Sequence, residues 1–331
     1  MPDSVRDREL LLTKLGKFKR GIAVTPEDLR QIDEGLVSRW QIDFISTPAT
    51  LLEFLEKLPE GETRTRGLAA FKADVAKRGG SSGEQNMYEA MADPQLCGLV
   101  TSSRRHYLLD AVAMAIALYR ILGLTGPILD VGCHVGVAPD FMAEILGVPV
   151  VGLEPVDAAV RIGSERLSGK PNVSIVHGAI PWQTDRKFQL ITAIDSMPGN
   201  VGDRSAYLRG LSQVLEDGGI ALIVSATWVQ ADVIVLRRQL EAAGLGFGFA
   251  DVVGGYGGMP TAFNVEGCVC LIKGGKQPFP RKVGEVMESG WDWFKAYANS
   301  TTTPAREKTQ AFMRSASTNQ VLLEQGSGGE A

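Results

Sequence analysis

The sequence predicts an α/β fold in which helices cover both faces of a doubly wound, mostly parallel sheet of seven strands. Three observations carry this prediction. Between residues 127 and 273, short apolar runs alternate with segments of helical periodicity, as in parallel sheets. The first two apolar runs each end in an acid, Asp130 and Glu154. No helix separates the last two runs, which favours an antiparallel hairpin at the end of the sheet.

Each expected element follows from its local pattern. The apolar or β-branched runs predict strands at 128–129, 148–153, 173–176, 188–194, 220–225, 247–253 and 267–273. Helices are expected at 138–146, 156–167, 204–215 and 231–243, and a long helix at 102–122 leads into the first strand. The turn 217–219, Asp-Gly-Gly, precedes the fifth strand.

The flanking regions have a different character. Residues 1–100 read as helical and polar, and Thr25 followed by Pro26, Glu27 and Asp28 predicts a helix start. We expect this region to act as a cap, a lid or a dimerisation surface on a domain spanning 101–275. Residues 276–331 are expected to hold one helix, at 283–299, and a disordered tail.

Composition excludes several classes of protein. With 331 residues, 44% of them hydrophobic, the chain can bury a large core. A net charge of −4 disfavours a general nucleic-acid partner. No apolar run approaches the roughly 20 residues of a membrane span, and the polar N-terminus is no signal peptide. The four cysteines lack zinc-site spacing, so a reduced, cytoplasmic protein is expected, with Cys268 and Cys270 on one buried strand face.

The first strand, the glycine-bearing turn at 132–136 and the following helix form a unit suited to a nucleoside. A dinucleotide site requires G-x-G-x-x-G, because its pyrophosphate must touch backbone amides at the helix start. Aligned on Gly132, that pattern needs glycine where His134 and Val137 stand. S-adenosylmethionine has no phosphate and instead needs an acid near its ammonium group and another for its ribose. Asp130 and Glu154 are the candidates.

On these residues the sequence resembles class I S-adenosylmethionine-dependent methyltransferases, whose first motif runs roughly D-x-G-x-G-x-G. Asp130, Gly132 and Gly136 match the motif, whereas His134 replaces its middle glycine. Glu154 followed by Pro155 is similar to a variant found in small-molecule O-methyltransferases. The resemblance covers about residues 122–275. It implies a Rossmann-like sheet with a C-terminal antiparallel hairpin, and S-adenosylmethionine as the cofactor.

The resemblance also implies where the cofactor binds. Asp195 and Ser196, after the fourth strand, would lie by the sulfonium, and Pro155 and Ile180 would sandwich the adenine. The full set of expected cofactor-binding residues is Asp130, Gly132, Cys133, His134, Gly136, Glu154, Pro155, Gly178, Ala179, Ile180, Asp195 and Ser196. The loop at 178–180 lacks the acid that often reads the adenine in this family. No metal site is expected.

Catalysis by such a site requires mainly that the acceptor be aligned in line with the methyl group and that water be excluded. A hydroxyl acceptor would benefit from a base, for which His106 and Asp195 are the candidates. His134 and His177 are interpreted as local structure.

The acceptor is expected to be a small metabolite, methylated more readily at oxygen than at nitrogen or carbon. The residues after the fourth strand do not form the N-P-P-Y tetrapeptide of many nucleic-acid and protein amide N-methyltransferases. Two alternatives stay open: an NAD(P)-binding oxidoreductase, and a non-catalytic S-adenosylmethionine-binding protein. A homodimer is one of the states considered.

Overall fold

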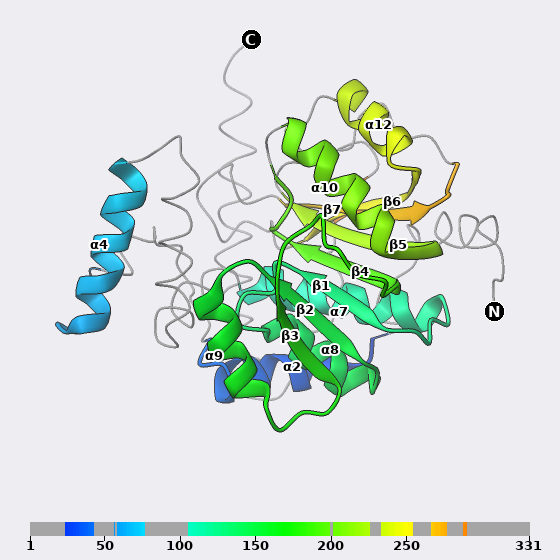
Figure 1. Cartoon of the computed structure of the whole chain (residues 1–331). Helices are drawn as coiled ribbons and strands as arrows, with labels where there is room; N and C mark the ends of the chain where they lie inside the picture. The colour runs from blue at the N-terminus through cyan, green and yellow to red at the C-terminus, as the bar shows by residue number, and fades with distance from the viewer. Residues whose placement is uncertain are drawn as a thin grey trace, which may run out of the picture.

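Eight strands form a single sheet at the centre of the molecule (Figure 1). The structure, a computed structural model, describes residues 24–42, 56, 58–76, 105–198, 201–225, 233–253, 266–276 and 287–289. The strand order is β3-β2-β1-β4-β5-β7-β6-β8. In chain order the strands are β1 (Ile128–Val131), β2 (Val150–Glu154), β3 (Val173–His177), β4 (Phe188–Ile194), β5 (Leu215–Ser225), β6 (Leu245–Val253), β7 (Glu266–Lys273) and β8 (Met287–Ser289).

The expected doubly wound sheet is confirmed. Strands β1 to β5 pair in parallel, and β7 runs antiparallel to both β5 and β6. The chain moves outward from β1 through β2 to β3 and then returns to the other side of β1 with β4. The carboxyl ends of β1 and β4 therefore flank a topological switch point, where open α/β sheets place their ligands.

Strand β8 corrects the prediction for the C-terminal region. The expected helix at 283–299 is wrong at Met287–Ser289, which pair in parallel with β6 as an eighth, edge strand. Three residues are too few for a hydrophobic period to separate a strand from a helix, and here pairing with β6 decides the outcome. The expected disordered tail lies outside the described residues.

Helices cover both faces of the sheet (Figure 1). Strand residues alternate between two hydrophobic clusters, since successive side chains point to opposite faces. One face packs under α7 (Arg105–Ile121), α8 (Val137–Leu146) and α9 (Asp157–Leu167), and the other under α10 (Val201–Val214) and α12 (Val233–Ala242). Cys268 and Cys270 lie on the α7 face, both fully buried, as predicted.

Helix α2 (Pro26–Ser38) packs on the same core as α7 and α8. Its start is confirmed: Thr25 and Asp28 form a reciprocal capping box, with Pro26 at the first position. The Arg120 guanidinium of α7 holds Asp28 through hydrogen bonds of 2.6 and 3.0 Å. Helix α4 (Glu62–Ala76) is the other described helix of the N-terminal region. The domain division at residue 100 stays a prediction.

The far end of α2 is held by a second polar group. The Asp140 carboxylate of α8, almost fully buried, accepts a hydrogen bond from Trp40 Nε1 at 3.0 Å and pairs with Lys170. Arg39 lies over the Phe141 ring and pairs with Glu144. Both ends of α2 are thus fixed to the sheet-covering helices.

The expected turn at 217–219 is built into β5 rather than preceding it. Phe188 pairs with Leu215 and Leu190 with Ile220, so the residues between Leu215 and Ile220 bulge out of the ladder. Gly218 adopts a φ of +70° there.

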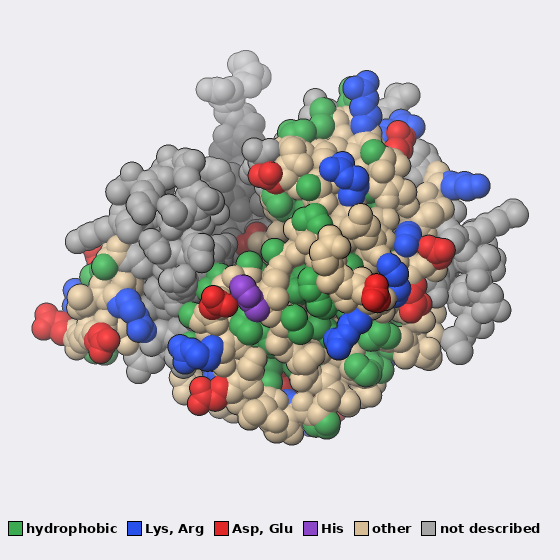
Figure 2. Space-filling view, viewed as in Figure 1, with side chains coloured by type: hydrophobic (Ala, Val, Ile, Leu, Met, Phe, Trp, Pro, Cys, Tyr) green, Lys and Arg blue, Asp and Glu red, His purple; other side chains and the backbone are tan. Residues whose placement is uncertain are grey.

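Over the described residues, no helix is long and apolar enough to cross a membrane. Acidic and basic side chains are interspersed over the face shown in Figure 2.

Candidate functional site

The turn after β1 has left-handed backbone at three alternate residues. Gly132, His134 and Gly136 have φ values of +72°, +50° and +86°. Glycine adopts this left-handed region freely, and histidine is among the residues enriched there. His134 therefore keeps the conformation of the glycine that it replaces. Gly136 then starts α8, and a Cβ at Gly136 would lie 2.6 Å from Ile175 Cδ1.

Glu154 joins this turn to the end of β2. Its carboxylate accepts hydrogen bonds from the backbone N–H of His134 at 2.7 Å and of Val156 at 3.0 Å. The side chain is 4% exposed, and burial raises its pKa, although the two backbone donors oppose that rise. A carboxylate so placed has acceptor capacity left for the hydroxyls of a ribose.

Asp130 is a buried acid in β1, 2% exposed. Thr192, its register partner in β4, donates a hydrogen bond from Oγ1 to Asp130 Oδ1 at 2.5 Å. Burial raises the pKa of Asp130 from 3.8 to about 7, and the nearby Glu154 charge adds to the rise while Thr192 opposes it. A cationic ligand at this place would favour the ionised form.

The loop after β3 lies beside Glu154. The Gly178 N–H donates to the Glu154 carbonyl at 2.9 Å, and His177 Nε2 lies 3.1 Å from the carbonyl oxygen of the exposed Pro155. Ala179 is exposed. Ile180 packs partly into the core, because a Cβ at Gly210 of α10 would lie 2.5 Å from Ile180 Cγ2. Only the remaining surface of Ile180 is left for an adenine ring.

The loop after β4 touches the glycine turn. A Cβ at Gly132 would lie 2.5 Å from the Ser196 Cβ, so the two loops are in direct contact. Asp195 is exposed and has a φ of +56°, and its N–H donates to the Val224 carbonyl at 2.8 Å. Sterically restricted backbone of this kind in a non-glycine residue is concentrated at functional sites.

Four loops, at the carboxyl ends of β1 to β4, therefore meet at one edge of the sheet. They bring together the expected cofactor-binding residues of those loops. The Cys133 side chain packs against β2, since a Cβ at Gly152 would lie 2.5 Å from its sulfur, and its proposed contact with the cofactor stays a prediction. Burial raises its pKa, so the thiol stays neutral.

The structure describes the side chain of only one of the two catalytic candidates, Asp195 and His106. Asp195 lies at this edge, whereas His106 is the second residue of α7 and its side chain lies outside the described ones. Among the described residues, no group of three or more His, Cys, Asp or Glu side chains is arranged to hold a metal ion.

Comparison with known proteins gives one family match. Residues 101–246 match a family described as "Methyltransferase domain". This part of the chain is therefore similar to methyltransferase domains, as the motif around Gly132 predicts. No curated protein sequence matches the chain.

Several solved structures of methyltransferases resemble about half of this chain. An S-adenosylmethionine-dependent methyltransferase from Clostridium acetobutylicum is 12% identical, with a TM-score of 0.43 over 50% of this chain and 92% of that one. The N-methyltransferase NodS from Bradyrhizobium japonicum is 14% identical, with a TM-score of 0.42 over 50% and 96%. Magnesium protoporphyrin IX methyltransferase from Synechocystis, solved with bound S-adenosylhomocysteine, is 14% identical, with a TM-score of 0.42 over 51% and 84%.

Sequence reasoning missed two residues whose side chains contact the candidate site, Thr192 and Tyr207. Thr192 could have been noticed because it is a polar residue inside the apolar β4 run. The register of β4 explains its polarity, since it places Thr192 beside Asp130. Tyr207 of α10 carried none, because nothing along the chain shows that its hydroxyl lies 3.0 Å from Ser196 Oγ.

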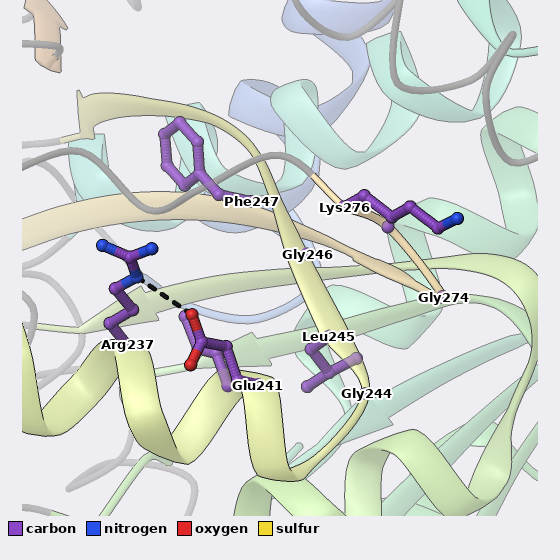
Figure 3. Close-up of a pocket in the computed structure, with 10 residues that line it drawn as sticks. Arg237, Glu241, Gly244, Leu245, Gly246, Phe247, Gly274 and Lys276 are labelled. Carbon is purple, nitrogen blue, oxygen red and sulfur yellow. Dashed lines mark hydrogen bonds and ion pairs between the residues drawn. The ribbon is translucent and has the colours of Figure 1, made fainter.

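A surface pocket of about 420 Å³ lies elsewhere (Figure 3). It is lined by the end of α12, the start of β6 and the chain after β7, including Arg237, Glu241 and Phe247. Because β6 runs in the direction of β1, its start lies at the opposite edge of the sheet from the four loops. None of the expected site residues lines this pocket, so it is separate from the candidate site.

Proposed function

We propose that this protein transfers the methyl group of S-adenosylmethionine to a small molecule, at oxygen, by in-line displacement. The observation that carries the proposal is the meeting of two buried acids and one exposed acid at the switch point. Asp130 and Glu154 lie on consecutive strands, 4% exposed or less, and Asp195 lies on the loop that contacts the glycine turn. The bound cofactor supplies an electrophilic methyl group.

Each loop has a proposed role toward that cofactor. Asp130 binds on the side of the ammonium group, and the Glu154 carboxylate accepts from the ribose hydroxyls. Pro155 and the exposed part of Ile180 enclose the adenine, whose edge meets the backbone at Gly178 and Ala179. The turn 132–136, with its left-handed residues, lets backbone approach the amino-acid part of the cofactor closely.

For the acceptor, we assign Asp195 as the group that positions a hydroxyl or takes up its proton, with His106 as the second candidate for the base. Mixed surface charge and a net charge of −4 support a small molecule over a nucleic acid as the acceptor.

The described cysteines Cys133, Cys268 and Cys270 are buried thiols, which supports a reducing compartment such as the cytoplasm. A homodimer stays a prediction that light scattering would test.

The decisive experiment is transfer of a labelled methyl group from S-adenosylmethionine into an extract of the producing cell, with mass identification of the product. A methyl ether or ester product is expected, and a methylated macromolecule or amine would refute the proposed acceptor. Calorimetry with S-adenosylhomocysteine and NAD separates the oxidoreductase alternative, which requires NAD to bind. Binding of S-adenosylhomocysteine without any methyl transfer would favour the non-catalytic alternative, which the acid-free loop at 178–180 supports.

A further inference from the structure

The loop that carries Asp195 is held to a buried phenol, the side chain of Tyr207. Tyr207 projects from α10 and is 5% exposed. Its hydroxyl lies 3.0 Å from Ser196 Oγ, and either oxygen can donate in this hydrogen bond. Tyr207 belongs to the hydrophobic cluster under α10 and α12, so its ring packs in the core while its oxygen reaches the site.

Ser196 is the point at which three parts of the site meet. Its Cβ occupies the space that a side chain on Gly132 would need, and its hydroxyl is bonded to Tyr207. Asp195, the preceding residue, is tied on its other side to β5 through the Val224 carbonyl. The backbone of β5 and the Tyr207 hydroxyl therefore both help to set the position of the loop that carries the Asp195 carboxylate.

We propose that Tyr207 is a positioning residue for the methyltransferase reaction: through Ser196, its hydroxyl fixes the Asp195 loop against the glycine turn and so sets where the Asp195 carboxylate meets the positive charge of the cofactor. This inference rests on the proposed function, which places the sulfonium beside Asp195 and Ser196.

The phenol is suited to this role over a wide pH range. Burial raises the pKa of Tyr207, and the nearby Asp130 carboxylate raises it further, while the Ser196 hydrogen bond opposes the rise. The hydroxyl thus stays protonated at neutral pH and remains a neutral hydrogen-bond partner, which adds no charge of its own next to a cationic ligand.

The test compares two ligands that differ in charge at the reacting position. Sinefungin carries an amine where S-adenosylmethionine has its methyl sulfonium, whereas S-adenosylhomocysteine is neutral there. Their dissociation constants would be measured by calorimetry on the full chain and on Tyr207→Phe, Ser196→Ala and the double variant. We expect each single variant to weaken sinefungin about fivefold and S-adenosylhomocysteine less than twofold. The double variant should lose no more affinity for sinefungin than either single variant, because both substitutions break the same hydrogen bond.

Tyr119→Phe is the matched control. Tyr119 of α7 is also a buried tyrosine, and its hydroxyl donates to the Gly126 carbonyl at 2.7 Å, at the edge of the sheet opposite the site. Its removal should lower stability without changing the ratio of the two dissociation constants. An unchanged ratio in both Tyr207→Phe and Ser196→Ala, or an equal change in Tyr119→Phe, would overturn the proposal.

Two further outcomes are distinguishable. Should Tyr207→Phe fail to fold, Ser196→Ala alone decides, since it removes the same hydrogen bond from the surface loop. Should the unmodified protein bind neither ligand, the proposed function itself fails and this inference fails with it. Binding of both ligands with no loss of sinefungin in Ser196→Ala refutes only the positioning role.

Discussion

The backbone N–H of His134 donates a 2.7 Å hydrogen bond to the Glu154 carboxylate, across 20 residues of chain. This bond explains how a histidine serves in place of the middle glycine of the turn. His134 holds a φ of +50°, and the acid at the end of β2 fixes its amide. Glu154 is thus both a proposed ribose ligand and the anchor of the glycine turn.

Two substitutions of His134 should therefore separate the effect of its backbone conformation from the effect of its imidazole side chain. His134→Gly is expected to change affinity for S-adenosylhomocysteine less than threefold, because glycine adopts the same backbone conformation. His134→Val should cost about 1–2 kcal/mol of unfolding free energy, since a β-branched residue resists a positive φ. Denaturant unfolding and calorimetry measure the two effects. Equal stability of the glycine and valine variants would contradict this account.

Replacing Glu154 by alanine should weaken S-adenosylhomocysteine binding more than tenfold, or about 1.4 kcal/mol. It should also lower stability by about 2 kcal/mol, because two backbone donors lose a charged acceptor. Asp157→Ala is the control, since that neighbouring carboxylate is 88% exposed. Unaltered affinity in Glu154→Ala would remove the ribose assignment.

The contact between Gly132 and Ser196 predicts a rescue experiment. Gly132→Ala should cost about 2 kcal/mol, because it adds a Cβ 2.5 Å from the Ser196 Cβ and strains a φ of +72°. Adding Ser196→Gly should recover part of the loss, since it removes the clash and leaves the strained φ. Thermal unfolding of the three variants tests this, and additive losses would show that the loops do not touch.

Asp130 predicts a dependence of ligand binding on pH. Its pKa of about 7 in the folded protein means that the carboxylate charges as pH rises from 6 to 8. Affinity for S-adenosylhomocysteine, whose ammonium is charged throughout this range, should rise with pH, and it should stay low and flat in Asp130→Asn. A pH-independent affinity of the unmodified protein would refute the assignment of Asp130.

The raised pKa of Asp130 also makes the stability of the folded protein depend on pH. Because the folded pKa of Asp130 lies above its ordinary value of 3.8, the folded state binds the proton more tightly than the unfolded state. The contribution of Asp130 to stability is therefore present at low pH and is lost as pH rises from about 4 to 7. Denaturant unfolding across this range should show a steeper decline in the unmodified protein than in Asp130→Asn.

Helix α2 should be indispensable to the folded domain. Leu36 is fully buried in the core shared with α7 and α8, so Leu36→Ala is expected to cost about 3 kcal/mol. The adjacent Val37 is 39% exposed, and Val37→Ala should change stability by less than about 0.5 kcal/mol. Similar stabilities for the two variants would mean that α2 is a detachable element.

Much of the fold was determined by the sequence alone, because its signals are local. Alternating apolar runs placed β1 to β7 nearly within their observed bounds, and Thr25 with Asp28 marked the start of α2. Asp130 and Glu154 were identifiable because an acid that ends an apolar strand is unusual. Family resemblance added the loops around Gly178 and Asp195, which the chain by itself does not connect.

Only the tertiary structure decided how these parts touch. No periodic pattern in the sequence predicts the left-handed φ of His134. Nor does one relate the residues that meet in the hydrogen bond between Tyr207 and Ser196 or in the pairing of β8 with β6. The packing of α2 against α7 and α8 is of the same kind. Periodicity reports which face of an element is apolar, whereas the neighbour of that face is chosen by packing of the whole chain.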